Sequence, residues 1–71
     1  MNKATVKMSL HLSPETNQIL EQLCQDNHLT KSDFIRKSIA LMQVALKNKK
    51  KGNHLVVIND KGENQGEIIG L

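Results

Sequence analysis

Eight residues near the start of the chain alternate strictly between polar and apolar side chains. They are residues 5–12, and they run directly into Ser13 and Pro14. Because successive side chains of a β-strand point to opposite faces, the pattern predicts a strand with one apolar face. That face carries Val6, Met8, Leu10 and Leu12, and the polar face carries Thr5, Lys7, Ser9 and His11. A lone strand of this kind is not stable in water, so it needs a partner strand from the tail or from a second copy of the chain.

Two helices are predicted after this strand. The first begins with Ser13 as its N-cap and Pro14 at its first helical position, both preferred there. Its apolar residues, Ile19, Leu20, Leu23 and Cys24, have the spacing of one helical face. The second is predicted to begin after Thr30, with Asp33 three residues later in a variant capping box, and to end at Gly52.

The apolar surface of the second helix is too wide to face the first helix alone. Phe34, Ser38, Leu41 and Ala45 form one row, and Ile35, Ile39, Met42 and Leu46 form the next. A chain of 71 residues makes one small domain with a marginal core, so oligomerisation is the expected stabiliser. The single cysteine, Cys24, excludes an intrachain disulfide and is expected to be a small buried apolar side chain. No apolar stretch has membrane-spanning length and no signal region precedes the strand, so the chain is expected to be cytoplasmic, with no membrane partner.

Charge divides the chain into a basic body and an acidic tail. Residues 1–51 hold nine lysines or arginines against four acids, a charge of +5, and residues 52–71 carry −2. A basic body favours polyanions as partners. The tail holds β-prone runs at 55–58 and 67–69 around turn chemistry at 59–62, so it is expected to be a short β-hairpin or disordered. We therefore divide the chain into a body, 1–51, and a tail, 52–71.

The order of a strand, a capped helix, a turn and a second capped helix resembles the ribbon-helix-helix family of MetJ/Arc-type DNA-binding proteins. The resemblance covers about residues 3–48 and rests on three stretches, 5–12, 12–15 and 29–36. It implies a mainly α fold with one N-terminal strand, in an intertwined homodimer whose strands form an intermolecular antiparallel two-stranded ribbon. It also implies that the ribbon enters the DNA major groove, as strands of this kind do.

The resemblance implies a role for each face of the ribbon. Lys7, Ser9 and His11, in duplicate, would face base edges, with Thr5 at the rim. The start of the second helix, with Thr30, Lys31 and Ser32, would hold the DNA backbone, and Lys3 could touch phosphate. The shared dimer core would contain Val6, Met8, Leu10, Leu12, Leu20, Leu23, Phe34, Ile35, Ile39 and Met42. The implied function is a transcriptional regulator, acting as a repressor of bacterial, plasmid or phage type, with dimers bound side by side on short repeats.

Several other interpretations stay open at this point. The tail could bind a partner protein, as in an antitoxin or plasmid-maintenance regulator. Alternatively, residues 5–12 could pair with the tail inside one chain, giving a small α+β interaction module without DNA binding. Thr30 could act only as a helix cap, and the lysines at 47–51 as a solvated helix end. Arg36 and Lys37 are expected on the outer face of the second helix, as solvent-exposed charges or as an ion pair with Asp33. The spacing of His11, Cys24, His28 and His54 matches no metal-ligand motif, and no nucleophile–base pair or glycine-rich phosphate loop is present, so neither a cofactor nor an enzyme is expected.

Overall fold

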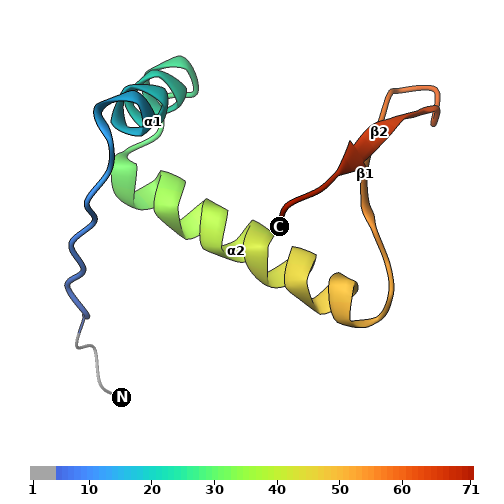
Figure 1. The fold of residues 1–71 in the computed structure, drawn as a ribbon. Helices are drawn as coiled ribbons and strands as arrows, with labels where there is room; N and C mark the ends of the chain where they lie inside the picture. Colours follow the sequence, from blue (N-terminus) through green and yellow to red (C-terminus); the bar gives the residue numbers. More distant parts are fainter. Residues whose placement is uncertain (1–4) are drawn as a thin grey trace. The chain divides into compact units, whose positions relative to one another are not determined.

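The computed structural model describes residues 5–71, in which two helices are followed by two strands (Figure 1). The helices are α1 (Pro14–Asp26) and α2 (Lys31–Lys50), and the strands are β1 (Leu55–Ile58) and β2 (Asn64–Ile68). Both predicted helices are confirmed. The chain divides into two compact units, and the division falls between Lys31 and Ser32. The first unit therefore holds α1, and the second holds nearly all of α2 together with both strands.

Both ends of helix α1 are capped by hydrogen bonds. The hydroxyl of Ser13 accepts a hydrogen bond from the Thr16 amide at 3.1 Å, and Pro14 occupies the first turn, as predicted. At the other end, the Leu29 amide donates to the Cys24 carbonyl at 2.9 Å. Between them His28 adopts a φ of +54°, which makes this a Schellman motif with histidine at the position that glycine usually takes.

Helix α2 ends in the same motif, with the expected glycine. Gly52 has a φ of +78°, and its amide donates to the Lys49 carbonyl at 3.0 Å. The Asn53 amide completes the motif by donating to the Asn48 carbonyl at 2.9 Å. Lysines in the last turn of the helix suit the negative end of its dipole. The predicted end of this helix at Gly52 is confirmed.

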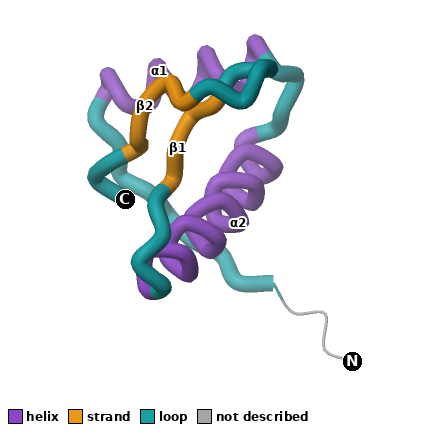
Figure 2. Tube along the Cα trace, turned by 90° about the vertical axis from the view of Figure 1, so that its right-hand side faces the viewer, coloured by secondary structure: helices purple, strands orange, loops and turns teal. Residues whose placement is uncertain are grey.

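The tail forms a β-hairpin, so the first of its two predicted alternatives is confirmed. Strands β1 and β2 pair antiparallel, with Leu55 opposite Ile68, and they run side by side in Figure 2. The side-chain oxygen of Asn59 accepts hydrogen bonds from the amides of Lys61 and Glu63, both at 2.9 Å, which closes the predicted turn. Strand β2 lies earlier than the predicted run at 67–69, because the ladder continues back to Asn64 across an irregularity beside Ile58.

The predicted N-terminal strand is not formed in the single chain. Residues 5–12 have no regular secondary structure, and the strands of the described chain follow the helices instead of preceding them. The physical reason is that a strand requires a neighbour for its backbone hydrogen bonds. Strands β1 and β2 pair with each other in a two-stranded sheet, and residues 5–12 do not belong to this sheet. The prediction of this strand is therefore wrong for one chain taken alone.

Very little apolar surface is buried within the described residues. Only Cys24 and Ala45 are buried there, which confirms the prediction for Cys24. The residues predicted to form a dimer core are exposed or half-buried: Val6, Met8, Leu10, Leu12, Leu23, Ile39 and Met42 are exposed, and Leu20, Phe34 and Ile35 are intermediate. Exposure of Val6 reaches 91% and that of Ile39 reaches 60%. None of the helices in the described chain is long and apolar enough to cross a membrane.

Candidate nucleic-acid interface

The residues predicted to contact bases lie on the segment that precedes α1. Thr5, Lys7, Ser9 and His11 are all exposed there. The apolar side chains between them are exposed as well, and their exposure falls from 91% at Val6 to 39% at Leu12, beside the N-cap of α1. Both sets of side chains are therefore open to a partner. Lys3, the fourth predicted phosphate contact, lies outside the described residues.

The predicted phosphate contacts lie around the first residue of α2. Thr30, Lys31 and Ser32 are consecutive and exposed, and α2 begins at Lys31, directly after Thr30. The first turn of a helix presents backbone amides and the positive end of its dipole, which suits a phosphate group. A cation and two hydroxyl groups are thus brought to a helix N-terminus.

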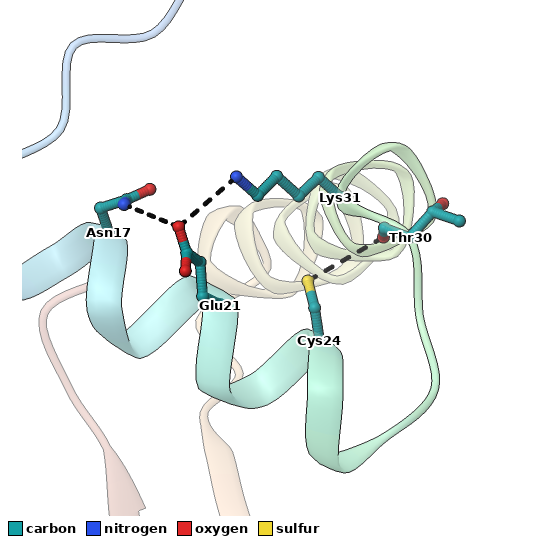
Figure 3. A network of polar contacts seen from close by, with 5 residues as sticks. All are labelled: Asn17, Glu21, Cys24, Thr30 and Lys31. Atoms are coloured by element: carbon teal, nitrogen blue, oxygen red, sulfur yellow. Dashed lines mark hydrogen bonds and ion pairs between the residues drawn. The ribbon is translucent and has the colours of Figure 1, made fainter.

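A carboxylate from α1 lies beside this cation. The ammonium nitrogen of Lys31 is 3.8 Å from Oε1 of Glu21, and the same oxygen accepts a hydrogen bond from Nδ2 of Asn17 at 3.0 Å (Figure 3). Sequence reasoning missed Glu21, which is ten residues from Lys31. The signal available was the spacing of four between Asn17 and Glu21, which places them on one helical face. Only the turn after α1 brings that face to Lys31.

The turn between the helices is also held by a buried cysteine. The thiol of Cys24 lies 4.0 Å from the carbonyl oxygen of Thr30, in a partly buried contact, as Figure 3 shows. Together with the hydrogen bond from Leu29 to Cys24, this contact fixes the backbone just before α2. The geometry at the start of α2 therefore depends on the packing of one small side chain.

Two other cations of α2, Arg36 and Lys49, have partners within the described chain. Nη2 of Arg36 is 2.7 Å from Oδ1 of Asp33, which confirms the ion-pair alternative for Arg36. At the other end, Nζ of Lys49 donates to the Leu71 carbonyl at 3.0 Å. This contact occupies Lys49 alone, and Lys47 and Lys50 are exposed in the same turn.

The second unit contains a pocket between the end of α2 and the hairpin. Its volume is about 420 Å³, and it is lined by Ala45, Lys49, residues 52–55 and residues 67–71. Nδ1 of His54 lies 3.2 Å from Oε2 of Glu67, and both residues line the pocket. The part of the chain that the structure describes has no group of three His, Cys, Asp or Glu side chains that could hold a metal ion.

Comparison of the chain with protein-family models, with curated proteins and with solved structures finds no match. The resemblance to the ribbon-helix-helix family therefore stays a prediction, and it rests on the residues described above.

Proposed function

We propose that this protein is a homodimeric, sequence-specific DNA-binding regulator that acts as a transcriptional repressor. The observation that carries the proposal is the exposed segment 5–12, which lies next to a capped helix. Its apolar and polar side chains alternate, all of them are exposed, and it pairs with no strand of the described chain. A second copy of the same segment would supply the missing backbone partner and cover the apolar face.

The apolar side chains of α2 support a dimer independently of this segment. Ile39, Leu41, Met42, Val44 and Leu46 are all exposed in the single chain. Full burial of a leucine, isoleucine or methionine side chain stabilises a protein by about 1.5–3 kcal/mol. With two buried residues in its described part, one chain has little of this stabilisation by itself, and an intertwined pair would gain it.

In the proposed complex, each part of the body has its own role on DNA. The ribbon of two segments would lie in the major groove, with two copies each of Lys7, Ser9 and His11 at base edges and Thr5 at the rim. Thr30, Lys31, Ser32 and the first amides of α2 would bind phosphates and set the register. One ribbon reads few base pairs, so two dimers would bind side by side on short inverted or direct repeats.

The experiment that tests this function is selection of bound sequences from random duplex DNA, using the whole protein. We expect enrichment of a short motif that occurs as an inverted or direct repeat. Recovered fragments that do not differ from the input pool would overturn the proposal. Omission of the protein provides the control for enrichment by the matrix alone.

A second candidate function concerns the hairpin. Strands β1 and β2 each keep one edge outside their shared ladder, and Val56, Val57 and Ile58 are exposed on β1. An edge of this kind can accept a strand from another protein, as in an antitoxin or plasmid-maintenance regulator. Co-purification of the product of a neighbouring gene, lost in a Val57→Asp variant that still binds DNA, tests this role.

The rival α+β interaction module would need residues 5–12 to pair with the tail. In the described chain the tail strands pair with each other, and the two-stranded sheet does not include the segment. This arrangement favours the dimeric ribbon. A protein that stays monomeric in sedimentation at micromolar concentration would instead favour the module.

A further inference from the structure

An acidic side chain of α1 lies beside the cation that the proposed function assigns to a DNA phosphate, in addition to Asp33 in the first turn of α2. Oε1 of Glu21 is 3.8 Å from the ammonium nitrogen of Lys31, at the start of α2 (Figure 3). All the residues of this contact belong to the first unit, so α1 and the turn after it determine the distance. No residue of the proposed ribbon takes part in it.

We infer that Glu21 is an electrostatic competitor of DNA phosphate for Lys31, and that it lowers the affinity of the protein for all duplex DNA without changing which sequence is preferred. This inference rests on the proposed function, in which Lys31 binds the DNA backbone. Glu21 is a regulatory residue in this scheme, because it acts through Lys31 and reads no base.

The geometry of the ion pair suits exchange between two anions. The separation of 3.8 Å is longer than a direct hydrogen bond, and the side chains of Lys31 and Glu21 are 61% and 58% exposed. An ion pair of this kind contributes little to stability, so a phosphate can take Lys31 from it at small cost. The carboxylate would then remain close to the phosphate, and the two negative charges would repel each other.

The carboxylate of Glu21 is held in place by its own helix. Nδ2 of Asn17, one turn earlier in α1, donates to the oxygen that faces Lys31, at 3.0 Å. The negative charge therefore stays beside the start of α2 when Lys31 moves to another partner. A Glu21→Gln substitution removes the charge and keeps a carbonyl oxygen that can accept from Asn17.

Helix α1 offers a matched control for this substitution. Oδ1 of Asp26 accepts a hydrogen bond from Nε2 of Gln22 at 2.8 Å, one turn earlier, in the same arrangement as Asn17 and Glu21. Within residues 5–71, Asp26 forms no ion pair with a lysine or arginine. Asp26→Asn therefore makes the same change in net charge and keeps a similar local contact, without removing the ion-pair partner of Lys31.

The test measures binding to the selected sequence and to a random duplex, over a range of salt concentrations. It compares the whole wild-type protein with Glu21→Gln, Asp26→Asn, Lys31→Met and the Glu21→Gln/Lys31→Met double variant. We expect Glu21→Gln to bind both duplexes about two- to tenfold more tightly at low salt, because each dimer carries two such pairs. The gain should shrink as salt rises, and it should be much smaller in Asp26→Asn.

The double variant shows whether the gain passes through Lys31. In the Lys31→Met background, Glu21→Gln should change affinity far less than it does in the wild type, since coupled residues are not additive. The inference would be overturned if Glu21→Gln raised affinity equally in the wild-type and Lys31→Met backgrounds, or if Asp26→Asn raised affinity as much as Glu21→Gln. Either result would show that the higher affinity comes from net charge alone.

Two further outcomes separate this inference from the function on which it rests. If the wild type binds duplex DNA and Glu21→Gln binds no more tightly, the inference alone fails. If the wild type binds no duplex DNA, the proposed function fails and the inference fails with it. Thermal unfolding followed by circular dichroism confirms that each variant keeps its helices before binding is measured.

Discussion

The Leu29 amide donates to the Cys24 carbonyl at 2.9 Å and closes α1 around His28, whose φ is +54°. The equivalent contact at the end of α2, from the Asn53 amide to the Asn48 carbonyl, encloses Gly52 with a φ of +78°. Both helices thus end in the same Schellman motif, one with a histidine and one with a glycine in the left-handed conformation. Only glycine adopts that conformation without a steric penalty.

His28→Gly should stabilise the protein. The left-handed conformation costs a residue with a Cβ atom about 1–2 kcal/mol, and glycine removes that cost. Glycine also makes the unfolded chain more flexible, which stabilises the unfolded state and offsets part of this effect. The unfolding free energy should therefore rise by roughly 0.5 kcal/mol. Urea unfolding followed by circular dichroism measures the change. A lower unfolding free energy than that of the wild type would show that the His28 side chain contributes contacts that outweigh its backbone cost.

Gly52→Ala should have the opposite effect. A Cβ atom added at this position meets no atom within 4 Å, so the loss comes from the backbone conformation and not from a clash. We expect the unfolding free energy to fall by about 1 kcal/mol. The same urea titration measures it, with His28→Gly as the reciprocal control. Unchanged stability would mean that the end of α2 can adopt another conformation at no cost.

Leu10→Asp should dissociate the proposed dimer, whereas Ser9→Asp should leave it intact. The two residues are neighbours, and alternation places their side chains on opposite faces of a strand. A carboxylate on the apolar face would be buried without a partner, and one on the polar face would stay in water. Sedimentation equilibrium at several concentrations distinguishes these outcomes. Equal dissociation constants for the two variants would contradict the ribbon, because both faces would then be equivalent.

Lys7→Ala and Lys31→Ala should weaken DNA binding in different ways. Lys7 is proposed to read a base edge, so its loss should reduce the preference for the selected sequence, by about 1–3 kcal/mol for a good base contact. Lys31 is proposed to bind phosphate, so its loss should weaken binding to all duplexes alike and reduce the salt dependence.

Titration of a selected and a random duplex at several salt concentrations separates these two roles. A Lys31 effect confined to the selected duplex would contradict its assignment to phosphate. If Lys7→Ala weakened binding to both duplexes equally, Lys7 would not read a base. The proposed ribbon would then lack its main cation for contacts with bases.

Local features of this protein were predictable from the sequence because they depend on neighbouring residues. The cap at Ser13, the stop at Gly52, the turn closed by Asn59 and the ion pair of Arg36 with Asp33 all join residues within five positions of one another. Burial of Cys24 followed from helical periodicity. The left-handed His28 was not anticipated, because histidine carries a much weaker preference for that conformation than glycine does.

The sequence by itself determined the two helices, the start of each, the end of the second at Gly52 and the turn of the hairpin, since capping, periodicity and turn chemistry act over a few residues. Only the tertiary structure decided that Glu21 lies beside Lys31, because the turn between the helices fixes that distance. It also decided that β1 pairs with β2 and leaves residues 5–12 without a strand partner in the chain. Alternation specifies which side chains share a face, but a strand forms only where another strand accepts its hydrogen bonds.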